Sequence, residues 1–110
     1  YDNAYLYYKI RQYQAASVAL KSLLKDYPDI DKQDRIQYYI VKSNKLFADN
    51  STSSKKLERY EETAKECTLF RETYPESEFS GEVNDIYNKT LVQINIHKNS
   101  THNGKEKRRN

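Results

Sequence analysis

The sequence predicts an all-α fold of about five helices, arranged as helical hairpin repeats that form part of an α-solenoid. Over most of the chain, apolar residues recur at separations of three and four, as they do on one face of an α-helix. The 110 residues include only two glycines and two prolines, and tight hairpins and strand corners depend on those residues. Each proline follows a helix of the same pattern, which indicates an internal repeat.

Residues 1–30 are predicted to form the first pair of helices. The first helix covers about residues 1–11, with Ala4 and Tyr7 among its packing positions. The second helix spans residues 13–26, and Pro28 ends it, because proline is common just beyond a helix end. Its expected inner face consists of Tyr13, Ala16, Leu20, Leu23 and Leu24.

Residues 31–76 are predicted to form a second, longer pair with an enlarged polar loop at residues 49–54. The third helix is expected to begin near Asp31, whose carboxylate can cap free amides, and to end near Ala48. The fourth helix runs from about residue 56 to residue 73, and Pro75 ends it. The expected inner faces are Ile36, Tyr39, Ile40, Ser43 and Phe47 on the third helix, and Leu57, Tyr60, Ala64, Cys67, Phe70 and Tyr74 on the fourth.

Residues 77–96 are predicted to form a C-terminal helix, with Ser77 or Ser80 as its cap. Its expected inner face is Phe79, Val83, Ile86, Tyr87, Thr90, Leu91 and Ile94. Residues 97–110 lack periodicity and large apolar side chains, so we expect a disordered basic tail. Five basic residues and one acidic residue lie in this tail, while residues 1–96 carry a net charge of −1. The basic character of the chain therefore belongs to the tail.

The two proline-terminated helices share one spacing pattern at a period of 47 residues. In the first, Tyr13, Ala16, Leu20 and Leu23 precede Pro28; in the second, the equivalent residues are Tyr60, Thr63, Cys67 and Phe70 before Pro75. With Ala4 and Tyr7, the first unit resembles a tetratricopeptide repeat (TPR), in which a small residue permits close helix crossing. Arg11 stands where that motif usually has glycine.

A narrower resemblance rests on five phrases: Leu6-Tyr7-Tyr8-Lys9-Ile10-Arg11-Gln12-Tyr13-Gln14-Ala15-Ala16, Ala19-Leu20-Lys21, Lys25-Asp26-Tyr27-Pro28-Asp29, Glu58-Arg59-Tyr60 and Tyr74-Pro75-Glu76-Ser77. Together they are similar to the C-terminal part of the BamD family, the TPR lipoproteins of the outer-membrane β-barrel assembly machinery. The resemblance covers about residues 1–96 and leaves out the tail.

This resemblance implies a scaffold on the periplasmic side of the outer membrane that supports insertion of β-barrel proteins. Its implied partners are the β-barrel assembly subunit with its periplasmic domains, other assembly lipoproteins and unfolded outer-membrane proteins. Contact with the membrane is implied only through a lipid anchor of a parent chain, since Cys67 lies inside a predicted helix. No specific nucleic acid is expected as a partner.

We expect no catalytic, cofactor-binding or metal-binding residues and no enzymatic activity. Both histidines, His97 and His102, lie in the predicted tail, which cannot hold a site to the precision that catalysis needs. The acidic residues around Glu62 alternate with Arg59 and Lys65, as on a solvated helix face. Cys67 occupies a packing position, where a small buried thiol is the expected role.

Four residues on the first helices of the two pairs are candidates for partner binding: Tyr8, Arg35, Tyr38 and Lys42. TPR superhelices line a concave surface with these helices, and tyrosine and arginine are enriched at interface hot spots. Alternatively, the tyrosines bury against neighbouring repeats. Two other function classes also stay open: a general TPR adaptor of the cell envelope, and a helical protein that binds a polyanion through its basic tail.

Overall fold

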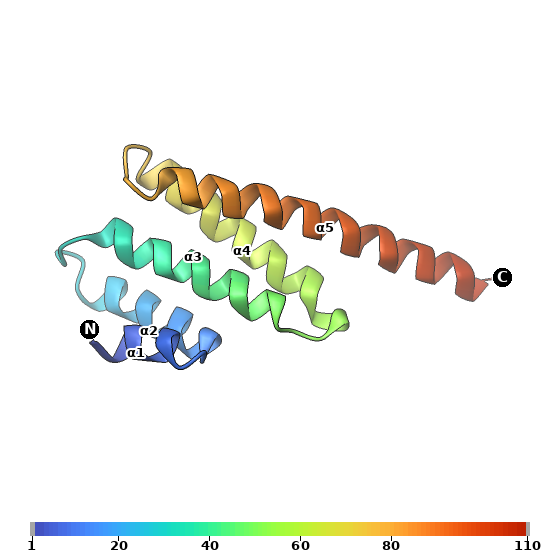
Figure 1. Ribbon diagram of the computed structural model, residues 1–110, viewed down its shortest axis with the longest axis horizontal. Coiled ribbons are helices and arrows are strands. Elements are labelled where there is room, and N and C mark those ends of the chain that lie inside the picture. Colours follow the sequence, from blue (N-terminus) through green and yellow to red (C-terminus); the bar gives the residue numbers. More distant parts are fainter. Residues whose placement is uncertain (1, 110) are drawn as a thin grey trace.

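The computed structural model describes the backbone of residues 2–109 and the side chains of residues 3–100. Within this range the chain forms five α-helices and no strand, which confirms the predicted all-α fold (Figure 1). The helices are α1 (Asp2–Lys9), α2 (Tyr13–Asp26), α3 (Gln33–Asp49), α4 (Ser53–Thr73) and α5 (Ser80–Arg109). The molecule is elongated, with principal extents of 57 × 28 × 20 Å.

Each helix packs mainly on the helix that follows it in the chain, and α3 also touches the start of α5. Figure 1 shows successive helices running in opposite directions, with α1 and α2 at one side and α5 at the other. This stacking of hairpins is compatible with a helical repeat, in which each unit contacts only its neighbours.

The first turn uses a left-handed residue to stop α1. Arg11 has a φ of 63°, while its amide donates to the Tyr8 carbonyl at 3.1 Å and the Gln12 amide donates to the Tyr7 carbonyl at 2.9 Å. This pair of hydrogen bonds is a Schellman motif, whose left-handed position is usually glycine. The arginine at the glycine position of the TPR pattern therefore adopts the backbone conformation that glycine would favour.

The turns after α2 and α4 have equivalent hydrogen bonds at the period of 47 residues. The Tyr27 amide donates to Leu23 and the Tyr74 amide to Phe70, at 3.0 and 2.8 Å. The next residues repeat the pattern, since Ile30 donates to Tyr27 and Ser77 to Tyr74. The sequence repeat is thus also a repeat of backbone structure.

Two apolar clusters meet at α3 and form the core. The first consists of Ala4, Leu20, Ile36 and Ile40, and joins α1, α2 and α3. The second consists of Tyr38, Val41, Cys67, Phe70 and Val83, and joins α3, α4 and α5. Helix α3 is buried on a wide face because it has neighbours on both sides, which explains why Val41 and Gln37 are buried although the predicted stripe omitted them.

The start of α3 and the loop after it differ slightly from the prediction. Helix α3 begins at Gln33 after Lys32, which has a φ of 56°, and the expected cap by the Asp31 side chain is absent. Asp34 instead accepts a hydrogen bond from the Ser77 hydroxyl at 2.6 Å, which ties α3 to the turn before α5. The predicted loop at 49–54 shortens to residues 50–52, because Asp49 ends α3 and Thr52 precedes α4.

The prediction of a disordered tail covers residues 97–110, and it is wrong for residues 97–100, which continue α5 as helix. The side chains of residues 101–109 lie outside the described residues. Extending an existing helix needs no new nucleus, so a helix can continue where apolar periodicity has ended. Asn110 lies outside the described residues.

Candidate partner-binding surface

Lys42 is the centre of a surface that α1 and α3 build together. Its Nζ atom lies 5.6 Å from the centroid of the Tyr8 ring, 5.3 Å from that of Tyr38 and 5.9 Å from that of Tyr39. An ammonium group within about 6 Å of an aromatic face is attracted by the ring quadrupole. Three rings therefore hold one cation between the two helices.

A second cation extends this arrangement along the same two helices. The Arg35 guanidinium lies 5.6 Å from the centroid of the Tyr5 ring, and Tyr5 meets Tyr39 edge to face at 5.1 Å. Tyr39 also meets Tyr8 at 5.2 Å. We call the surface formed by Tyr5, Tyr8, Arg35, Tyr39 and Lys42 the tyrosine–cation surface.

The structure brings three of the four predicted candidates to this surface, while the fourth, Tyr38, contacts Lys42 but is buried. Tyr8 and Lys42 are partly exposed and Arg35 is exposed. Tyr38, by contrast, is only 5% exposed, and its ring stacks on Phe79 at 4.5 Å with an interplanar angle of 12°. The expectation that Tyr38 faces outward is wrong, because Phe79, the residue before α5, covers its ring.

Tyr5 and Tyr39 complete the surface, although sequence reasoning did not select them. Tyr39 was assigned to the inner face of its helix, and Tyr5 was not singled out. The available signal was their spacing, because Tyr5 and Tyr8 are three residues apart on α1, as Arg35 and Tyr39 are four apart on α3.

Both cations of this surface are open to an external partner. Within residues 3–100, the ion pairs join Lys21 to Glu66, Lys45 to Asp49 and Lys65 to Glu62, so no described carboxylate pairs with Lys42 or Arg35. The surface can therefore offer two positive charges, tyrosine hydroxyls and ring edges to a polypeptide. Tyrosine and arginine supply such contacts at many interfaces.

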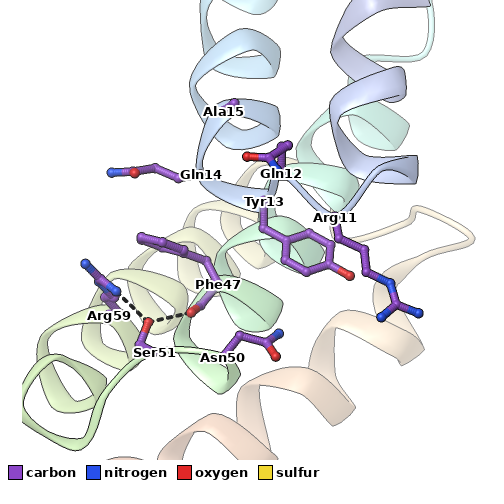
Figure 2. Close-up of a pocket in the computed structure, with 9 residues that line it drawn as sticks. All are labelled: Arg11, Gln12, Tyr13, Gln14, Ala15, Phe47, Asn50, Ser51 and Arg59. Atoms are coloured by element: carbon purple, nitrogen blue, oxygen red, sulfur yellow. Dashed lines mark hydrogen bonds between the residues drawn. The ribbon is translucent and has the colours of Figure 1, made fainter.

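A neighbouring pocket of about 450 Å³ lies where the α1–α2 turn approaches the α3–α4 loop (Figure 2). One wall is formed by Phe47, Ser51 and Arg59. The Arg59 guanidinium lies 4.1 Å from the centroid of the Phe47 ring and donates to the Ser51 hydroxyl at 2.6 Å, and that hydroxyl donates to the Phe47 carbonyl at 2.5 Å. Through these contacts Arg59 joins α3 and α4, so the expectation that it lies on a solvated helix face is wrong.

Most predicted packing positions are buried. Ala16, Leu20, Thr63, Cys67 and Phe70 have no exposed area, and Ala4 and Tyr60 are at most 5% exposed. Tyr13 and Leu23 are partly buried, and Pro28 and Pro75 are exposed in the turns that they help to form. Tyr7 differs from the prediction, because it is 40% exposed on α1.

His97 lies on a folded helix, in contrast to its predicted place in a tail. Its ring stacks on Tyr60 at 5.9 Å with an interplanar angle of 26°, and the Tyr60 hydroxyl donates to Asp49 at 2.5 Å. These contacts join α5 to the end of α3 through α4. The His102 side chain lies outside the described residues.

Cys67 is fully buried, and loss of water from around the thiol raises its pKa to about 12 from an ordinary value of 9.0. The nearby Arg71 charge opposes this rise. Burial also raises the pKa of Tyr60, with help from its hydrogen bond to Asp49, and the pKa of Tyr74. A neutral buried thiol is a poor nucleophile, which supports the packing role predicted for Cys67.

These shifts predict that the free energy of unfolding falls in alkaline solution. A raised pKa means that the unfolded chain releases the proton first, so the stabilising contribution of Cys67 is complete below about pH 9 and is lost as the pH rises toward 12. Urea midpoints measured between pH 8 and pH 11 should decline less steeply in Cys67→Ala than in the unchanged chain. Identical slopes would contradict the assignment to Cys67.

Among the described residues, no three His, Cys, Asp or Glu side chains gather as a metal site would require. Searched in the same range, none of the helices has the length and apolar character that crossing a membrane demands. No protein-family model matches the chain, and no curated protein matches it.

Proposed function

We propose that this chain is a non-enzymatic helical scaffold of the outer-membrane β-barrel assembly machinery, part of a BamD-like TPR lipoprotein. It binds a periplasmic domain of the β-barrel assembly subunit and so supports insertion of β-barrel proteins. The proposal is supported by the resemblance of residues 1–96 to that family and by the hairpin architecture, which is compatible with a TPR-like solenoid. The partner class comes from the resemblance alone.

The observation that carries the proposal is the environment of Lys42. A lysine held between three tyrosine rings on two helices is positioned before any partner arrives, so little side-chain freedom is lost when it binds. Arg35 adds a second charge on the same face. A polypeptide with a carboxylate and an apolar or aromatic side chain would complement this surface.

Calorimetry with the purified periplasmic domains of the assembly subunit tests the proposal at fixed salt. Lys42→Ala and Tyr8→Ala should each weaken binding by about 1–2 kcal/mol, as the loss of a hot-spot residue does. Lys25→Ala is the matched control, because Lys25 is exposed on α2, a helix that contributes no residue to the tyrosine–cation surface. It should bind as the unchanged chain does.

Two results would contradict the proposal. One is absence of binding by the unchanged chain, and the other is an equal loss in Lys25→Ala and Lys42→Ala. A shortened chain that ends at residue 100 distinguishes this proposal from polyanion binding, because it lacks most of the basic side chains of residues 97–110. Binding that depends on residues 101–110 and falls steeply with salt is typical of polyanion recognition.

A further inference from the structure

An open groove of about 550 Å³ lies between helices α4 and α5. Its floor is apolar, and two of its leucines are strongly exposed, Leu69 at 49% and Leu91 at 42%. Lys65 and Lys98 lie at its edges, as do Glu61 and Glu72. The exposure of Leu91 differs from the prediction, which placed this residue on the inner face of its helix.

The period of 47 residues relates the α2–α3 pair to the α4–α5 pair position by position. Ile36 of α3 corresponds to Val83 of α5, and Ser43 corresponds to Thr90. All four side chains are fully buried. Ala16 of α2 corresponds in the same way to Thr63 of α4, and both are fully buried. The two helix pairs therefore share these buried positions at the period of 47 residues.

This equivalence extends to the groove. The α2–α3 pair has a cleft of its own, and its six lining residues from these helices are Gln14, Ser17, Val18, Lys21, Asn44 and Phe47. Adding 47 to each number gives Glu61, Ala64, Lys65, Thr68, Leu91 and Ile94, and all six line the groove between α4 and α5. The groove is thus the second copy of the α2–α3 cleft.

A third helix borders the α2–α3 cleft. Arg59 and Glu62 of α4 line one side of it, and the Glu66 carboxylate of α4 binds Lys21 of α2 at 2.8 Å. Helix α4 runs antiparallel to α3 in this position (Figure 1). The equivalent position on α4 and α5 has no helix within residues 2–109.

We propose that the groove between α4 and α5 binds an amphipathic helix of a partner protein, antiparallel to α5, in the position that α4 takes on α2 and α3. This surface is separate from the tyrosine–cation surface, and the inference does not depend on the identity of the assembly partner. It rests on continuity with an interface that the chain already makes once.

The side chains that change between the two clefts define the chemistry of the partner helix. Beside the α2–α3 cleft, Arg59 stacks on Phe47 and donates to Ser51. The equivalents of Phe47 and Ser51 in the groove are Ile94 and Lys98, so an arginine there would meet a like charge. An apolar residue over Ile94 and a carboxylate beside Lys98 would fit instead.

A second copy of the chain is a poorer occupant. Helices α2, α3 and α4 are each packed on two neighbours within the chain. Of the large apolar side chains exposed on the described part of the first hairpin, Leu6, Tyr7 and Ile10 belong to α1 and the turn after it, and α2 itself adds Val18 alone. Helix α1 has only 8 residues against the 21 of α4. Such a short helix would leave most of the groove uncovered.

A labelled peptide copy of α4 tests the proposal, because α4 is the helix that borders the equivalent cleft. The probe consists of residues 53–73 with Arg59→Glu, and its fluorescence anisotropy is followed while the full chain is added in reducing buffer. We expect saturable binding. The peptide with Arg59 unchanged should bind on the order of threefold more weakly, as loss of one exposed charge pair predicts.

Variants on both walls of the groove locate the binding. Leu91→Glu should weaken binding of the probe at least about tenfold, since it places a charge on the apolar floor. Val92→Glu is the matched control, because Val92 is the next residue of α5, is 57% exposed and does not line the groove. Leu69→Glu repeats the test from α4, and circular dichroism confirms that each variant is helical.

Three results would overturn the proposal. They are no saturable binding by the unchanged chain, equal binding by Leu91→Glu and Val92→Glu, and an unchanged chain that sediments as a dimer which Leu91→Glu dissociates. The last result would make a second copy the occupant. The assay contains no assembly subunit, so its failure is distinct from failure of the proposed function.

Discussion

Replacing Phe70 with alanine is expected to lower the free energy of unfolding by about 3–5 kcal/mol, the range for loss of a buried aromatic side chain. Phe70 is fully buried in the cluster that joins α3, α4 and α5. Its ring also contacts Tyr74, with centroids 5.5 Å apart. A loss of this size is a large fraction of the free energy of unfolding of a small domain. Urea unfolding should therefore show a much lower midpoint.

Leu69→Ala is the matched control for this prediction. Leu69 is the preceding residue of α4, has a side chain of similar apolar character and is 49% exposed. Its replacement should cost less than about 1 kcal/mol, because most of the lost side chain is already in water. Equal losses in the two variants would mean that the inward face of α4 is wrongly assigned.

Replacing Ala16 with leucine is expected to destabilise the chain by about 1–3 kcal/mol through overpacking. Ala16 has no exposed area, and it lies on α2, which packs against both α1 and α3. A larger side chain would force these helices apart. Chemical denaturation of the variant measures the effect.

Lys65→Ala serves as the reference for this second substitution. The Lys65 side chain is 75% exposed and its only ion pair among the described residues, with Glu62 at 3.3 Å, is a surface contact. Its replacement should change the free energy of unfolding by no more than about 0.5 kcal/mol. Similar losses in both variants would contradict the repeat alignment that places Ala16 at a helix crossing.

The helices could be predicted from the sequence because each has at least one face buried by its neighbours, which imposes a period near 3.6 on the apolar residues. The prediction failed where a helix has neighbours on two sides. Tyr38 of α3 is buried by Phe79, a residue 41 positions later, and periodicity within one helix contains no information about such a distant contact.

The C-terminal part of α5 could not be predicted from apolar periodicity for a different reason. A helix that continues beyond its packed region needs only compatible backbone propensities, and a polar residue such as Lys98 satisfies that condition as well as an apolar residue does. His97 likewise belongs to a folded contact with Tyr60, although the residues that follow it are polar.

The candidate surface was predicted in part, since Tyr8, Arg35 and Lys42 gather on it as expected for the first helices of successive hairpins. Tyr39 was missed because a periodic pattern assigns each residue to one face only. In the structure its ring borders the core and also lies 5.9 Å from the Lys42 ammonium. An amphipathic ring can serve both environments.

The packing of each helix on the next one in the chain also bears on how fast the protein folds. Contacts between neighbouring helices have short sequence separation, so few long loops must close before native contacts form. Chains of this kind typically fold in microseconds to milliseconds. Folding can begin at any hairpin and spread in either direction, and α3, which belongs to both core clusters, is the helix through which the two halves would become cooperative.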